Sequence, residues 1–333
     1  MAEGFGNMSA PMDQGDNSDS AAPPRANLEV FADTLLELAA GDRNVIAVTS
    51  DSRGSGKLSD FARRLPSQLI EVGIAEQNLV GVSAGLASAG KKVFAVSPGC
   101  FLSARALEQI KNDVAYSNHP VKLIAISAGV SYGALGSTHH SLHDIAALRA
   151  INNIDIVVPA DNFETRHAIV EAYRHERPIY IRFGKKTMPH LHRCGQSFSI
   201  GRAITVREGT DASFIATGET VWPALQAAEL LTGEGLSCRV VSMHTIKPLD
   251  SRAVEESARQ TRAVVTVEEH SVNGGLGEAC AGVLMQAGIA VPMRIVGIPD
   301  EHIVSGSQGE IFAHYGISPQ GLADIVRKLL SKG

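Results

Sequence analysis

Residues 68–90 read QLIEVGIAEQNLVGVSAGLASAG, a short apolar strand that runs through Glu71 into a helix of small residues. Gly, Ala and Ser recur along this helix and let a neighbouring backbone or a flat ligand come close, so we expect the helix to be buried. After Glu71, Glu76 is the one charge in the stretch. A carboxylate in a first helical turn either complements the helix dipole or, if buried, relays a proton with a raised pKa.

Length and composition predict two globular domains. The chain has 333 residues, 44% of them hydrophobic, which is enough for a sizeable core. The formal net charge is -5, so no basic surface for nucleic acid is expected. Residues 1–27 are rich in Gly, Asn, Asp, Ser and Pro, and we expect a disordered tail there.

The cysteines predict an intracellular environment. Four are far apart and form no CxxC pair: Cys100, Cys194, Cys238 and Cys280. This spacing favours reduced thiols over a disulfide framework or a zinc site. Residues 1–27 have no export signal, and no apolar run is long enough to span a membrane. We therefore expect a cytoplasmic protein.

Apolar runs alternate with amphipathic stretches along residues 28–186. The expected strands are 44–48, 92–96, 121–127, 154–158 and 178–183, and the expected helices are 28–40, 74–89, 104–117, 141–149 and 162–175. Continuous apolar strands separated by helices indicate a mostly parallel sheet covered on both faces. The pattern predicts an α/β, doubly wound first domain.

A second alternation occupies residues 204–333, after a polar stretch at 187–203 that we interpret as a linker. The expected strands are 212–218, 237–243, 263–269 and 293–298, with helices at 221–231, 250–260 and 276–287. This is a smaller α/β domain. Its turn Asn273-Gly274-Gly275-Leu276-Gly277 lacks the full GxGxxG spacing and the later acidic residue of a dinucleotide site, so we assign it no chemistry.

Several motifs together resemble one family. They are GIAEQNLVGVSAGLASAGKKVFAVS (73–97), EQIKNDVAY (108–116), GSTHHSLHDIAALRAINNIDIVVPAD (136–161) and PIYIRFGKK (178–186). In the same order and spacing, they are similar to the pyrimidine-binding domain of transketolase-type enzymes, which depend on thiamine diphosphate. TGETVWPALQAA, VSMHTIKPLD and VEEHSVNGGLGEA resemble the family's carboxy-terminal domain, so the resemblance covers residues 28–331.

The resemblance implies roles for cofactor-binding residues. Glu76 would hydrogen-bond the aminopyrimidine of thiamine diphosphate and exchange a proton with it, as a general acid and base. Phe101 would stack on the pyrimidine, although a lone aromatic is more often a core residue. Arg105 belongs to the same turn. Asp51 lies in the loop after the first strand, where parallel sheets collect ligands.

The resemblance also implies substrate contacts. His139 would lie over the reacting carbons; its i, i+4 partner His143 suggests a metal pair, but no nearby Cys or Glu completes such a site, so we expect no metal ligands here. Arg182, Ser55 and Ser127 would contact the substrate phosphate. For Arg182 the alternative is an interdomain salt bridge, and for Ser55 a plain turn.

Two departures from the family pattern guide the functional prediction. The Gly-Asp-Gly motif that holds the metal and diphosphate does not occur in the sequence. We therefore expect one subunit of a split transketolase, with Mg²⁺ and diphosphate ligands supplied by an amino-terminal subunit in a heterotetramer. Ser127 and Leu135 replace a family His and Asp that read common sugar phosphates, so the expected phosphorylated substrate differs from common pentose phosphates.

Two alternatives remain open from sequence. One is the beta subunit of a 2-oxoacid dehydrogenase's decarboxylase component, which has the same two domains. The other is a non-catalytic scaffolding subunit of the same fold, against which the retention of Glu76 argues.

Overall fold

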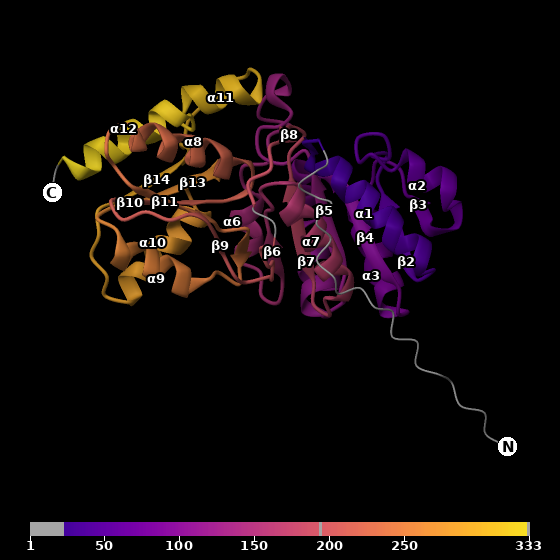
Figure 1. Ribbon diagram of the computed structural model, residues 1–333. Coiled ribbons are helices and arrows are strands. Elements are labelled where there is room, and N and C mark those ends of the chain that lie inside the picture. The colour runs from indigo at the N-terminus through magenta and orange to yellow at the C-terminus, as the bar shows by residue number, and fades with distance from the viewer. Residues whose placement is uncertain (1–22, 193–194, 332–333) are drawn as a thin grey trace.

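The computed structural model describes residues 23–192 and 195–331 (Figure 1). The expectation of a disordered tail falls mostly on residues 1–22, outside the described part, as does Cys194. Arg25–Ala26, which we assigned to the tail, instead forms strand β1, and Asn27 begins helix α1. The other three cysteines are free and buried.

A seven-stranded sheet forms the first domain, in the order β12-β6-β7-β5-β4-β2-β3. Its strands are β2 (Val45–Thr49), β3 (Leu69–Glu71), β4 (Lys92–Pro98), β5 (Lys122–Ile126), β6 (Asp155–Val157), β7 (Ile179–Phe183) and β12 (Thr245–Lys247). All neighbours are parallel except the β12–β6 pair. Every residue of β2, β5 and β7 is buried, as expected for strands covered on both faces.

Helices cover both faces of this sheet. On one face lie α1 (Asn27–Gly41), α7 (Asn162–Arg174) and the short α2 (Ser59–Arg64); on the other lie α3 (Glu76–Ser88), α4 (Gly99–Arg105) and α6 (Asp144–Arg149). The helix expected over residues 104–117 is divided. After α4, a short α5 (Leu107–Gln109) leads into a π-helix at Ile110–Tyr116. Single π-turns of this kind are frequent near functional sites.

The second domain has a five-stranded sheet in the order β14-β13-β10-β11-β9. Its strands are β9 (Ile204–Arg207), β10 (Ala212–Ala216), β11 (Cys238–Ser242), β13 (Val264–Ser271) and β14 (Met293–Ile298). Helices α8 (Val221–Thr232) and α12 (Pro319–Leu330) pack on one side, and α9 (Ser251–Gln260) and α10 (Leu276–Gln286) on the other (Figure 1). We did not predict β9, β12, α12 or α11 (Gln308–His314) from the sequence.

The two domains share buried structure. Strand β12 comes from the second half of the chain yet completes the edge of the first sheet. One apolar cluster includes Leu148 of α6 together with Val254 of α9 and Leu276 of α10. Because this contact is a continuous apolar core, it holds the domains in one relative orientation.

The segment expected as a polar linker is packed rather than exposed. Strand β8 (Thr187–Met188) pairs antiparallel with β1, and the side chains of Met188, Leu191 and Phe198 are buried. These apolar residues anchor the segment to the rest of the fold. Its composition alone did not reveal that role.

His192 lies in a buried ion cluster in this segment. Its Nδ1 is 2.9 Å from a carboxylate oxygen of Asp161, and its Nε2 is 3.0 Å from one of Glu164. Burial lowers the pKa of the imidazole, but the two carboxylates outweigh burial and raise the pKa of His192 to about 10. The same pairing lowers the pKa of Glu164 to about 2, against the effect of burial. His192 is therefore a permanent cation at neutral pH.

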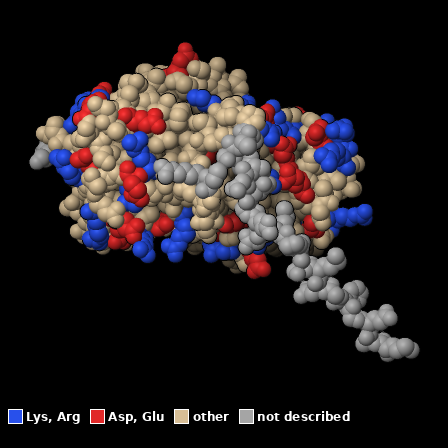
Figure 2. All heavy atoms as spheres, viewed as in Figure 1, with Lys and Arg blue, Asp and Glu red and all other residues tan. Residues whose placement is uncertain are grey.

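Charges of both signs are interspersed on the face drawn in Figure 2. Within the described residues, none of the helices combines the length and the apolar character that crossing a membrane requires.

We predict that His192→Gln lowers the free energy of unfolding by about 3 to 5 kcal/mol at pH 7, because two buried carboxylates lose their cation. The folded pKa of His192 is raised to about 10, so its contribution is complete below pH 6.5 and is lost as pH rises through 10. The gap between wild type and variant should therefore narrow from pH 7 to 10 in urea titrations. His302→Gln, at an exposed position, is the control; an equal loss there, or a gap independent of pH, would contradict the prediction.

Candidate active site

The turn before α3 is held by Glu71. Its carboxylate accepts hydrogen bonds from the amides of Asp51, at 2.6 Å, and Gly73, at 3.1 Å. Gly73 has a φ of 74°, in the left-handed region that favours glycine. The end of β2 is thereby tied to the start of α3. This arrangement places Glu76, the first residue of α3, at the carboxyl edge of the sheet.

Glu76 is buried, with only 4% of its surface exposed. Nη1 of Arg105, at the end of α4, donates to both of its carboxylate oxygens at 3.1 and 3.2 Å. The same guanidinium lies over the ring of Phe101, 4.2 Å from the ring centroid. The structure thus brings together three of the residues expected from the sequence to bind the cofactor.

This arrangement fits the pyrimidine end of thiamine diphosphate. A flat, hydrogen-bonding heterocycle needs an aromatic face to stack on and a buried carboxylate to bond, and Phe101 and Glu76 supply both. The Arg105 guanidinium, itself flat and rich in N–H groups, meets both requirements in the present structure. About half of its side chain is exposed, so it can move aside without disturbing a packed core.

A loop after β5 adds His139 to this group. The imidazole contacts the edge of the Phe101 ring, with centroids 5.2 Å apart, and that of Tyr132 at 5.4 Å. Its Nδ1 is 2.9 Å from the hydroxyl of Thr138. The ammonium of Lys185 lies 4.0 Å from the Tyr132 ring centroid. Acid–base, aromatic and cationic groups therefore meet at one edge of the sheet.

The other two histidines of this loop have structural partners. His140 is buried and bonds the carbonyl of Gly133, while Nε2 of His143 is 3.3 Å from the hydroxyl of Ser103. His139 and His143 thus contact different groups and do not form the i, i+4 chelating pair that their spacing suggested.

Arg182 does not present its guanidinium to a substrate phosphate in this structure. Only 3% of its surface is exposed; it pairs with Asp144 at 2.7 Å and donates to the backbone carbonyl of Glu269 at 2.9 Å. These contacts favour the interdomain alternative. Ser127 is likewise fully buried, with a φ of 54°, so it is closed to a substrate.

Two further expected residues lie in the loop after β2. Asp51 and Ser55 are both exposed, and Asp51 has a left-handed φ of 53°. No contact among the described residues joins either side chain to Glu76 or His139. Their expected roles in binding cofactor and substrate stay predictions.

Sequence reasoning missed Tyr132 and Lys185. Tyr132 lies inside the loop that joins β5 to the His139 motif, and Lys185 follows the end of β7, where parallel strands collect ligands. The position of Lys185 was therefore available as a signal. That of Tyr132 was not, because no periodicity marks a loop.

The glycine-rich turn before α10 is filled by the protein itself. The carboxylate of Glu268 accepts hydrogen bonds from the amides of Leu276, at 2.7 Å, and Gly277, at 2.8 Å. A Cβ at Gly275 would lie 1.9 Å from a Glu268 oxygen. The first amides of α10 thus bind an internal carboxylate, in agreement with our assigning no chemistry to this turn.

Helix α3 is buried on one side only, so the expectation of a buried helix is half correct. Leu79, Ser83 and Ala87 face the core, whereas nothing lies within 4 Å of a Cβ built at Gly81 or Gly85. Just before the helix, Ile74 is 75% exposed. An open strip of small residues therefore runs beside the site.

Comparisons with known proteins match both domains. Residues 24–190 match the pyrimidine-binding domain of transketolase and residues 201–322 its C-terminal domain. The chain is 48% identical to one of the two kinds of chain named for apulose-4-phosphate transketolase, from Phocaeicola vulgatus, over 91% of this chain and 96% of that protein. It is 38% identical to the 6-deoxy-6-sulfo-D-fructose transketolase subunit SqwH of a Clostridium species, over 82% and 84% of the two chains.

A solved structure agrees with these relatives. The chain superposes on a split-gene transketolase, described as an inactive beta4 tetramer, with a TM-score of 0.85 and 36% identity, over 92% of this chain and 99% of that one. Both domain matches, the close relatives and the shared fold point the same way: this chain is a member of the transketolase family.

Proposed function

We propose that this chain is the pyrimidine-binding subunit of a split transketolase, which transfers a two-carbon ketol unit from a ketose to an aldose. The observation that carries the proposal is the buried Glu76 carboxylate beside the face of Phe101, with His139 at the edge of the same ring. The relatives named as transketolase subunits support it, and they do not favour the 2-oxoacid dehydrogenase or scaffolding alternatives.

Thiamine diphosphate, when bound, supplies the nucleophilic carbon that no side chain of this site offers. Phe101 would stack on its pyrimidine, and Glu76 would hold and exchange a proton on the ring nitrogen that it bonds. His139 would donate to or accept from a substrate hydroxyl. Arg105 would leave Glu76 when the ring enters and would stay near as a cation.

The other half of the site would come from an amino-terminal subunit, including the ligands of Mg²⁺ and the diphosphate. The strip formed by Ile74, Gly81 and Gly85 adjoins Glu76 and gives a partner's backbone room for close approach. The relative solved as a beta tetramer without activity suggests that beta chains associate but need a partner. We propose a heterotetramer, and a cytoplasmic location in keeping with the free thiols.

Lys185 is our candidate for binding the substrate's anionic end, since Arg182 is occupied by Asp144. Partial burial, and then repulsion from Lys57, lower the pKa of the Lys185 ammonium. An anion beside these two lysines would relieve that repulsion. Ser55 lies in the same loop as Lys57 and can add a hydroxyl. The substrates named for two relatives carry a phosphate or a sulfonate, and such oxyanions suit this pair.

The test of the proposal is ketol transfer by the chain copurified with its amino-terminal partner. We predict activity that depends on thiamine diphosphate and Mg²⁺ for the mixture and none for either chain alone. Glu76→Gln should lower kcat by about 10²- to 10⁴-fold, because the proton exchange is lost, while the assembly still forms. Glu108→Gln, on a neighbouring helix, is the matched control. An unchanged kcat in Glu76→Gln would limit Glu76 to capping the helix.

Replacing Lys185 tests the anion site. We predict that Lys185→Met raises the KM for phosphorylated sugars about 10- to 100-fold with little change in kcat, because one charge-assisted hydrogen bond of about 1.5 to 3 kcal/mol is removed. The KM for unphosphorylated sugars should not change. Lys186→Met, at the next position, is the charge-matched control. If Lys185→Met behaves like that control, the anion binds elsewhere.

Leu135 tests the acceptor preference. It is 56% exposed in the loop that carries His139, and its side chain cannot accept a hydrogen bond. We predict that Leu135→Asp improves kcat/KM for ribose 5-phosphate by about 5- to 100-fold, the value of pairing a hydroxyl otherwise left unsatisfied. Leu135→Asn separates polarity from charge. A native preference for ribose 5-phosphate, unchanged in Leu135→Asp, would refute the specificity argument but not the transferase proposal.

A further inference from the structure

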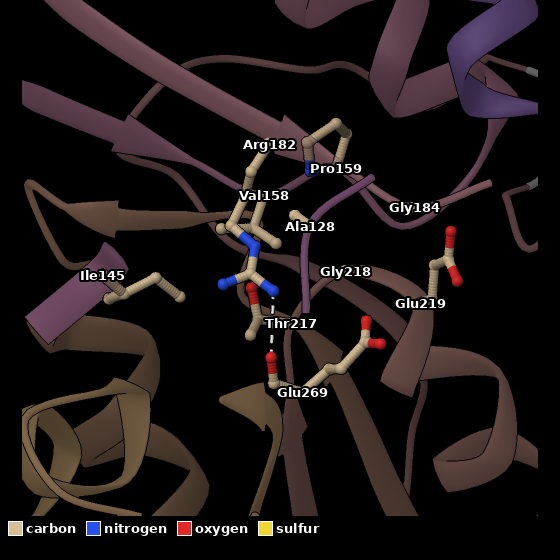
Figure 3. A pocket seen from close by; sticks show the side chains of 10 residues that line it. All are labelled: Ala128, Ile145, Val158, Pro159, Arg182, Gly184, Thr217, Gly218, Glu219 and Glu269. Carbon is tan, nitrogen blue, oxygen red and sulfur yellow. Dashed lines mark hydrogen bonds between the residues drawn. The ribbon is translucent and has the colours of Figure 1, made fainter. Parts of the chain in front are cut away.

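Two buried carboxylates meet where the domains join, away from Glu76. Glu219 lies in the turn Gly218–Thr220 after β10, and Glu269 lies in β13; each is only 7% exposed. Nε2 of Gln308, from α11, is 2.9 Å from an oxygen of each carboxylate. Figure 3 shows both side chains on the same side of a small pocket, with the Glu269 carboxylate reaching toward Glu219.

Both carboxylates press against the backbone of the first domain. A Cβ added at Gly129 would lie 2.2 Å from the carboxyl carbon of Glu269, and one at Gly184 would lie 2.2 Å from an oxygen of Glu219. Such distances leave no room for any side chain but glycine's. The pair is therefore wedged between the ends of β5 and β7 and the second domain.

The charges around the pair do not balance if both carboxyls ionise. Arg182 is the buried cation nearest to Glu269, and its guanidinium is already paired with Asp144. Lys186 approaches Glu219 only from the exposed edge, and Gln308 is neutral. Burial, and then the charge of Glu269, raise the pKa of Glu219 to about 8. Burial raises the pKa of Glu269 as well.

Glu269 also holds the loop that carries the site. Its carboxylate accepts a hydrogen bond from the amide of Val130 at 2.9 Å. The loop leads from there through Tyr132 and His139 and closes on itself, where the amide of Ser141 donates to the carbonyl of Gly129 at 2.8 Å. The base of the His139 loop is thus bonded to a residue of the second domain.

We propose that Glu219 and Glu269 share one proton and together act as positioning residues for the loop of residues 128–143. Glu219 carries the proton, and Glu269 keeps the charge that binds the Val130 amide. Loss of the proton puts two negative charges side by side in the seam and drives the carboxyls, and the loop base with them, apart. The benefit to catalysis rests on the proposed function; the proton sharing and the loop contact do not.

The sign of the pH dependence follows from linkage. A carboxyl whose folded pKa is raised stabilises the closed loop fully below its unfolded pKa, and that stabilisation is lost as pH rises through about 8 for Glu219. If opening exposes Glu219 to water, the opening equilibrium should rise about tenfold per pH unit below pH 8 and level off above it. The groups facing the pair are Arg182, Lys186 and Asp144, none of which is expected to titrate between pH 6 and 8.

Hydrogen–deuterium exchange of the full chain tests this proposal without a partner or cofactor. After correction for intrinsic exchange rates, we predict that protection of residues 128–143 falls about tenfold per unit from pH 6 to 8. Glu219→Gln, which mimics the protonated carboxyl, should keep this protection constant over that range. Glu269→Ala should lose it at every pH, and Glu269→Gln, which can still accept from Val130, should restore most of it.

Glu268→Gln is the matched control on the same strand. Because Glu268 bonds the amides of Leu276 and Gly277, this variant should weaken protection of α10 and leave residues 128–143 unchanged. Protection of the loop that does not change with pH in wild type, or that falls equally in Glu219→Gln, would overturn the proposal. Neither outcome would affect the ketol transfer assay, so the two proposals fail independently.

Discussion

The buried pair of Arg182 and Asp144 is the interaction on which the rest of the structure depends. Asp144 accepts from Arg182 and from the hydroxyl of Tyr180, both at 2.7 Å, and Arg182 reaches across to the backbone of Glu269. Burial alone raises the pKa of Asp144, but Arg182 and His270 outweigh it and lower that pKa. Removing either partner would leave an uncompensated charge, which is why such pairs join domains so firmly.

The protein satisfies several of its possible anion sites with its own carboxylates. Asp144 takes the Arg182 guanidinium, Glu268 takes the first amides of α10, and Asp161 with Glu164 takes His192. Each of these positive groups looks like a ligand site in the sequence. Internal pairing removes them from consideration and leaves Lys185 as a cation at the open edge of the site.

Most secondary structure, and the centre of the site, could be predicted from the sequence. Apolar runs predicted every strand in the core of the two sheets, and the family motifs predicted Glu76, Phe101, Arg105 and His139, which the structure brings into one chain of contacts. The predictions failed where packing rather than local pattern decides. The supposed linker is buried, and the edge strand β12 joins a sheet about 90 residues away in sequence.

The sequence by itself determined the α/β class, the two alternating domains and the identity of the acid–base residue, because hydrophobic period and motif spacing are local properties. Only the tertiary structure decided what each charged residue does. Arg182, Glu219 and Glu269 have the same residue types as ligand-binding groups, but whether a charge faces a substrate or another side chain depends on which distant groups folding places beside it. Desolvation and pairing arise only after that, so no reading of spacing could have assigned them.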